Sequence, residues 1–308
     1  MKKICMLVAV AIALVAGFAC TQEETEVKIS KTEQAAFDEL RMQIAALNAS
    51  YGVDEASRAD NTNKKKKGRF LAIVNADLTG AGDAFDINLG PFFWIKMLVK
   101  GVQASVNTAS ELYGESLENQ EVTSYVPVKA YDNPNTIWPE GLPHNPTLLD
   151  SVGYAHNEII VNLYRRFGDD LYTFDEQTRL SHIRQQTAIY TGDNRALTAP
   201  GLRTDFNNVL KALTDENIEE SYSALIQIRP HMTNELLVLK EFCYALSQFE
   251  SDEEILEYTQ AHNGLIMISD IMEGSKEFIK AATLIGSHST LMWKPVNSLT
   301  DDDVVVEP

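Results

Sequence analysis

The sequence predicts an all-α fold, an antiparallel bundle or array of helices joined by short loops. Apolar residues recur at spacings of three and four along most of the chain, which is the period of a helix with one buried side. The alternating apolar and polar pattern of strands is nearly absent. Five of the ten prolines fall within residues 119–147, where they predict an ordered loop or hinge between two helical regions.

One amphipathic helix and a less regular segment are expected first. The helix should occupy about residues 30–51, and the polar, lysine-rich residues 54–68 should form a loop. Residues 69–84 open with an apolar stretch and become rich in small residues. There, Gly80 and Gly82 indicate either a close approach of two helices or a turn.

A longer helix is expected at residues 91–117, just before the proline-rich loop. Its apolar stretch at 89–99 contains Lys96 and is too short to span a bilayer, so packing in the core is the preferred interpretation. Seven apolar residues share one side of this helix: Trp94, Ile95, Leu98, Val102, Val106, Ala109 and Leu112.

The chain after the proline-rich loop predicts one helix after another. Ser251 and Gly274 occupy positions where helix caps belong. We expect residues 31–295 to form a single helical domain, with any boundary between lobes at 119–147, and residues 296–308 to form an acidic tail. The expected helices are 148–167, 175–190, 201 or 204 to 213, 215–228, 230–249, 252–272 and 275–293.

The first twenty residues predict an export signal. Two lysines near the start precede about fifteen apolar residues, and Ala19-Cys20 follows. A basic start, an apolar run and a small residue at the cut are typical of secretory signals, and this run is shorter than the roughly 20 residues of a membrane-spanning helix. Because a cysteine directly follows Ala19, residues 1–19 are interpreted as a lipoprotein signal peptide, cleaved between Ala19 and Cys20, with lipid attached to Cys20.

The residues around the predicted cleavage site also indicate in which membrane the protein is anchored. Gly17 stands where lipoprotein signals usually carry Leu, Val or Ile, so plain secretion is the alternative. Residues 20–30 should form a flexible acidic tether. Thr21 replaces the Asp that usually retains lipoproteins in the inner membrane, which favours the outer membrane. The acidic residues 22–24 resemble a surface-export signal of Bacteroidota lipoproteins, so both the periplasmic and the cell-surface face stay open.

Composition argues against nucleic acid as a partner and against disulfides as a source of stability. The net charge is −18, and a strongly acidic protein repels nucleic acid, whose binding requires Lys and Arg to neutralise phosphates. Of the three cysteines, Cys5 leaves with the signal peptide and Cys20 carries the lipid. Cys243 is then alone, so no disulfide within the mature chain is expected and stability must come from packing. Its apolar neighbours predict a core position for Cys243.

Three patches together resemble a family of exported Bacteroidota proteins. The first is Ala-Asp-Leu-Thr-Gly-Ala-Gly at 76–82. The second, at 145–158, contains Asn-Pro, then Asp-Ser-Val-Gly, then His-Asn. The third, at 282–293, is rich in serine and ends in tryptophan. The resemblance implies an exported, all-helical protein and implies no particular reaction.

Asp150, His156 and Asn157 form the most suggestive polar group. Asp150 and His156 are six residues apart, so on one helix they meet only awkwardly, whereas zinc ligands on a helix prefer a spacing of four. We therefore expect His156 and Asn157 to bond to a neighbouring helix or to the proline-rich loop, with Gly153 allowing close helix contact. Neither a metal site nor a cofactor is predicted.

Two further groups carry weaker signals. His262-Asn263 repeats the His-Asn dipeptide on a later helix, either by coincidence or as part of a polar network or ligand pocket. Residues 287–289, Ser-His-Ser, lack the Gly-x-Ser-x-Gly elbow of serine hydrolases.

These observations predict a lipid-anchored, non-enzymatic envelope protein that binds a protein or small-molecule partner outside the cytoplasm. A role in antagonism between species, or in immunity to it, is a sub-case suggested by the Gly/Ala-rich segment of the resembling family. The alternative is a hydrolase or metal-dependent enzyme centred on Asp150, His156 and Asn157, and a structural envelope component is a third class. An enzyme should place His156 about 3 Å from a carboxylate or a second histidine in an open pocket.

Overall fold

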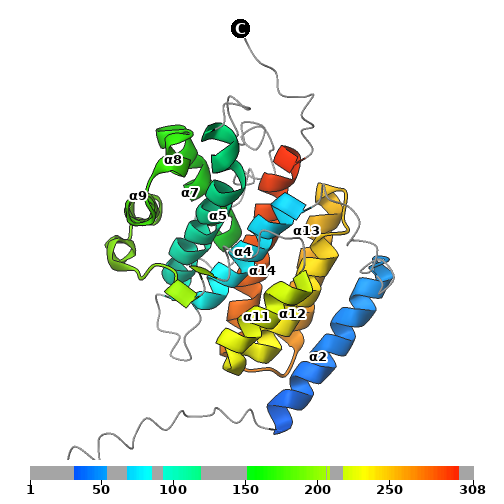
Figure 1. Ribbon diagram of the computed structural model, residues 1–308. Helices are drawn as coiled ribbons and strands as arrows, with labels where there is room; N and C mark the ends of the chain where they lie inside the picture. The colour runs from blue at the N-terminus through cyan, green and yellow to red at the C-terminus, as the bar shows by residue number, and fades with distance from the viewer. Residues whose placement is uncertain are drawn as a thin grey trace, which may run out of the picture.

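The computed structural model describes residues 31–53, 68–84, 93–118, 151–205, 207–208 and 218–297. Within this part of the chain it contains ten α-helices, two short 3-10 helices and no strand, which confirms the all-α prediction (Figure 1). The predicted signal peptide with Cys20, the tether, the proline-rich loop and Asp150 lie outside the described residues.

Most helices lie within a few residues of their predicted positions. The final helix reaches residue 297, beyond its predicted end at 293. In chain order the elements are α2 (Lys31–Ser50), α4 (Gly68–Asp83), α5 (Phe93–Glu118), α7 (Val152–Phe167), α8 (Asp170–Thr173), α9 (Glu176–Thr191), η4 (Asn194–Thr198), α11 (Ile218–Ile228), η5 (Pro230–Met232), α12 (Thr233–Leu246), α13 (Asp252–Ile268) and α14 (Glu273–Asn297).

Local differences from the predictions have physical reasons. The segment at 69–84 is one continuous helix, α4, because Gly80 lies against a neighbouring helix and forms no turn. Gly274 is not a cap, since α13 already ends at Ile268 and Gly274 lies in the first turn of α14. The prediction for Ser251 is confirmed: it forms a capping box with Glu254, each side chain satisfying the backbone amide at the other position.

Helices α4, α5 and α14 form the centre of the fold. In Figure 1, α4 and α14 run side by side, with α5 and α7–α9 on one side and α11–α13 on the other, and α2 lies at the edge. Every described side chain of α4, residues 72–83, is buried, as are residues 97–109 of α5 and 285–293 of α14. A helix buried on all sides has no solvent face for its polar residues, so these must find partners inside the protein.

The core is continuous across the described helices. One cluster of buried apolar side chains extends from Phe37 on α2 to Trp293 on α14. Cys243 is a fully buried member of it, as predicted, and burial raises the pKa of its thiol to about 12. No helix in the described part of the chain is long and apolar enough to cross a membrane.

Helix α2 is attached to the body by one apolar face and two polar contacts. Phe37, Leu40 and Ile44 are its buried apolar residues, spaced to share one side. Near the start of the helix, Asn234 Nδ2 on α12 donates to Gln34 Oε1 at 3.1 Å. Near its end, the Tyr258 hydroxyl on α13 donates to Asn48 Oδ1 at 2.6 Å. These contacts hold α2 against α12 and α13.

Candidate functional site

A buried carboxylate, Asp77 on α4, is the centre of a polar cluster contributed by four helices. The hydroxyl of Ser105 on α5 donates to Asp77 Oδ2 at 3.1 Å, and the hydroxyl of Ser289 on α14 donates to the same oxygen. All three residues are fully buried. Trp293 Nε1 donates to Ser105 Oγ at 3.3 Å, which directs the proton of that serine toward Asp77.

His156, on α7, faces the other oxygen of the same carboxylate. Its Nε2 lies 3.7 Å from Asp77 Oδ1, within ion-pair range but beyond a hydrogen bond. Neither atom has a hydrogen-bond partner among the described residues. His156 also has no exposed surface. The contact is therefore electrostatic, in a region where water does not screen it.

The hydrogen bonds around His156 determine which of its nitrogens carries a proton. Asn157 Nδ2 donates to the carbonyl of His288 at 2.7 Å, which orients the amide so that its Oδ1 faces His156 Nδ1 at 3.1 Å. An amide oxygen only accepts, so Nδ1 must hold a hydrogen. A lone pair on Nε2 opposite an ionised Asp77 would be repulsive inside the core.

Asp77 Oδ1 and His156 Nε2 thus face each other across 3.7 Å, with no hydrogen bond between them among the described residues. Burial raises the pKa of Asp77, and the opposing effects of His156 and the two serines are smaller.

Glycine allows the helices of the cluster to approach each other closely. A Cβ atom added at Gly153 on α7 would lie 2.1 Å from His288 Cδ2 and 2.4 Å from the carbonyl oxygen of Leu284, both on α14. At Gly80 on α4 it would lie 2.6 Å from Ala104 Cβ on α5. The prediction that Gly153 serves close helix contact is confirmed, and Gly80 is a close approach and not a turn.

The three patches of the family resemblance meet in this cluster. Patch 76–82 contributes Asp77, the part of patch 145–158 within the described residues contributes His156 and Asn157, and patch 282–293 contributes Ser289 and Trp293. The expected hydrogen bond to a neighbouring helix is present for Asn157, whereas His156 bonds to Asn157 on its own helix and only faces Asp77 on α4.

Among the described residues, the carboxylate partner of His156 is Asp77, on a different helix. Asp77 was not singled out as a site residue, although a lone acid between Ile73 and Leu78 in an apolar helix already requires a buried partner.

The arrangement differs from a hydrolytic triad. In such a triad the histidine lies between the serine and the acid and takes the serine's proton. Here both Ser105 and Ser289 donate directly to Asp77, and no hydrogen bond joins His156 to either serine within the described residues. No group of three or more potential metal ligands occurs in that part of the chain. The geometry is that of a hydrogen-bonded junction between helices.

A second buried carboxylate, Asp83, closes the end of α4. Its Oδ2 accepts from Lys100 Nζ at 2.6 Å and from the backbone amide of Arg203 at 3.0 Å, and its Oδ1 accepts from Arg229 Nη2 at 2.7 Å. Lys100 Nζ also donates to the Asp83 carbonyl at 2.9 Å, a favourable position for a cation at a helix C-terminus. Burial lowers the pKa of Lys100 even beside this acid.

The second His-Asn pair lies in a different environment. His262 is fully buried on α13, its ring lies beside the rings of Phe242 and Tyr258, and neither ring nitrogen has a hydrogen-bond partner among the described residues. Burial lowers the pKa of His262 to about 3, so the ring is neutral at physiological pH. Asn263 accepts a hydrogen bond from Thr283 at 2.7 Å, and no hydrogen bond within the described residues links this pair to His156.

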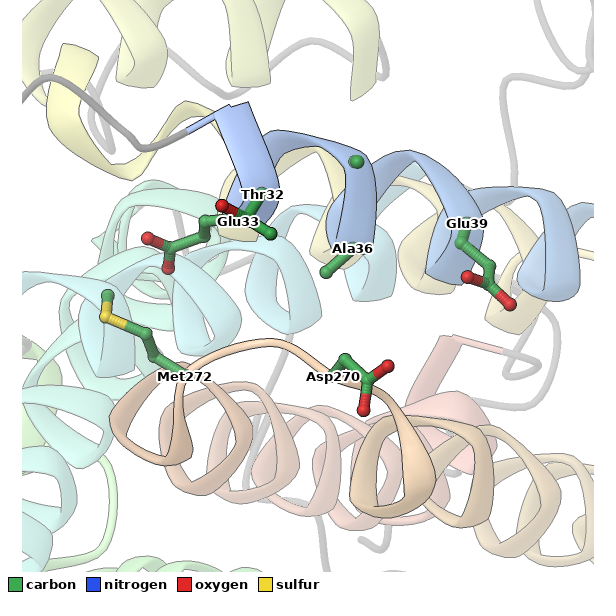
Figure 2. Close-up of a pocket in the computed structure, with 7 residues that line it drawn as sticks. Thr32, Glu33, Ala36, Glu39, Asp270 and Met272 are labelled. Carbon is green, nitrogen blue, oxygen red and sulfur yellow. The ribbon is translucent and has the colours of Figure 1, made fainter.

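The surface has a groove between the first turns of α2 and the turn that joins α13 to α14 (Figure 2). Its volume is about 480 Å³, within the range of about 300–1,000 Å³ that is usual for ligand pockets. Three of its residues are acidic and the others are apolar or neutral. Met272 is 56% exposed beside it. The lining residues, called the α2 groove below, are Thr32, Glu33, Ala35, Ala36, Glu39, Asp270 and Met272.

Comparison of the chain with protein families, with curated proteins and with solved structures finds no match. Two features of the described residues stand out by their geometry. One is the sealed junction around Asp77 and His156, and the other is the accessible, acidic α2 groove.

Proposed function

We propose that the protein is a lipid-anchored, non-enzymatic component of the bacterial outer membrane that binds a partner outside the cytoplasm. The observation that carries the proposal is Cys20 directly after Ala19, at the end of a short apolar leader with a basic start. An acyl chain attached there provides the membrane affinity that this leader, once cleaved, no longer supplies.

The burial of the polar cluster around Asp77 supports the non-enzymatic part of the proposal. Asp77, His156 and Ser289 have no exposed surface, and their hydrogen-bonding groups are directed at one another across α4, α7 and α14. A catalytic acid–base pair needs a substrate atom within hydrogen-bond reach. The accessible α2 groove, by contrast, combines apolar contact area with charge, as binding surfaces do.

Anchoring is tested by Cys20→Ala in cells of the native host. The wild-type protein should be found in the outer-membrane fraction and should incorporate an alkyne-tagged palmitate, whereas Cys20→Ala should lose the label and leave that fraction. Cys5→Ala is the matched control, because it removes a cysteine from the leader without touching the cut. Membrane retention of Cys20→Ala with no lipid on the wild-type peptide would refute the proposal. Protease treatment of intact cells then decides between the two faces.

A further inference from the structure

We propose that the α2 groove binds a cationic, amphipathic helix of a partner protein, placing one or two apolar side chains between α2 and the α13–α14 turn. The inference rests on the partner-binding function proposed above and names the class of partner. It follows from the shape of the groove, from the charge around it and from the exposed apolar residues beside it.

The apolar part of the groove suits a helix. Ala35 and Ala36 line the groove with small side chains, so they let another helix backbone come close to α2. Figure 2 shows Ala36 on the side of α2 that faces the α13–α14 turn. Met272, on the other side of the groove near Glu33, is 56% exposed, and Met267 and Ile268 at the end of α13 are 40% and 76% exposed (Figure 2). Flexible Met side chains on an exposed surface adapt to apolar side chains of a partner. An amphipathic helix in a groove of this kind contributes apolar side chains spaced three and four residues apart.

The negative charge around the groove favours a partner helix that is positively charged. Glu33, Glu39 and Asp270 surround it. Glu235 on α12 is almost fully buried and accepts a hydrogen bond from Ser275 at 2.6 Å. Burial raises the pKa of Glu235, and the negative charge of Glu33 adds to the effect. Lys or Arg side chains of a partner would relieve this concentration of negative charge.

The same charge argues against a second copy of the chain as the occupant. With a net charge of −18, two copies repel each other, and a symmetric contact through this groove would place like carboxylates together. A helix rich in Lys is the complementary alternative. Attraction of this kind weakens as salt rises, since exposed charges are screened beyond about 8 Å at physiological ionic strength.

The test uses the chain from Thr21 onward, which lacks the leader and the lipidated cysteine and is studied in solution. Its ligands are two labelled 18-residue peptides of identical Lys and Leu composition. In one peptide the leucines share a single helical face, and in the other they are distributed around the helix. Fluorescence anisotropy should show at least about tenfold tighter binding of the first peptide, with an affinity that falls as salt is raised. Equal binding of both peptides would indicate unspecific attraction and would overturn the proposal.

Substitutions locate the binding surface. Ala35→Trp fills the groove from an exposed position and should weaken binding at least about tenfold, whereas Ala45→Trp, exposed on the same helix but outside the groove lining, should not. Glu39→Lys and Asp270→Lys should also weaken binding. Asp170→Lys is the charge-matched control, exposed on α8 on the other side of the molecule from α2 (Figure 1).

The outcomes separate the two proposals. Equal weakening by Asp170→Lys, or no effect of Ala35→Trp, would overturn the groove assignment. Sedimentation showing a dimer of the wild-type chain that Ala35→Trp dissociates would assign the groove to a second copy instead. None of these measurements depends on the lipid, so failure of the peptide assay leaves the anchoring result standing, and failure of anchoring leaves the peptide assay valid.

Discussion

Replacing Gly153 by alanine measures how tightly α7 packs against α14. The added methyl carbon would lie 2.4 Å from the carbonyl oxygen of Leu284, against a van der Waals separation of about 3.5 Å. The oxygen belongs to a helix backbone and cannot rotate away, so the two helices must separate by roughly 1 Å. Overpacking costs about 1–3 kcal/mol, and the upper end of this range applies because the contacted atom belongs to the backbone. Alanine returns about 1 kcal/mol of helix propensity, which leaves a net cost of about 2 kcal/mol.

We therefore expect Gly153→Ala to lower the free energy of unfolding by about 2 kcal/mol, which corresponds to a fall in Tm of about 5 °C. Urea and thermal unfolding followed by far-UV circular dichroism provide the measurement. The matched control is Gly264→Ala on α13, where the added Cβ meets no atom within 4 Å and the residue is exposed. The free energy of unfolding of Gly264→Ala should exceed that of the wild type by up to about 1 kcal/mol. If both variants are equally stable, or if Gly153→Ala exceeds the wild type, the close approach of α7 and α14 is wrong.

Three further predictions address buried polar groups. His262 has a folded pKa of about 3 against 6.5 when unfolded, so the unfolded chain binds the extra proton between these values and stability is lost as pH falls below 6.5. Between pH 7.5 and pH 5 the wild type should lose about 2 kcal/mol more than His262→Phe in urea unfolding, and parallel losses would contradict this. Asp83→Asn should lower the free energy of unfolding by about 3–5 kcal/mol, because the buried Lys100 and the partly buried Arg229 lose the carboxylate that they bond. Adding Lys100→Met should recover part of that loss in the same assay, and simple additivity would show that the ion pair is not coupled. Cys243 in the mature chain from Thr21 onward should react with a thiol reagent only in denaturant, since it is fully buried with a pKa of about 12, and rapid labelling of the native protein would disprove its core position.

The positions of most helices could be predicted because they depend on local periodicity. Phe37, Leu40 and Ile44 on α2 are three and four residues apart, and that spacing alone specifies one buried face. Helix α8 was not predicted, since its four residues are too few to show a period. The cap at Ser251 follows from residue type, whereas α13 ends at Ile268, before the predicted end at 272.

The candidate site could be predicted only in part. His156 and Asn157 were singled out from their chemistry, and their bonding to another helix was expected. Their partners come from distant parts of the chain: Ser289 lies 212 residues from Asp77, and Ser105 lies 28 residues from it. Hydrophobic periodicity carries no information about which two helices meet, so the carboxylate that faces His156 could not be named.

The sequence by itself determined that the chain is helical and that a glycine at position 153 serves a close contact, and it predicts an export signal before Cys20. These are local properties of spacing, residue size and residue type. The tertiary structure decided that Asp77, His156 and Ser289 share one sealed cluster. It also decided that Glu33, Glu39 and Asp270 surround one groove. The physical reason is that burial and charge proximity arise only when helices far apart in the chain pack against each other.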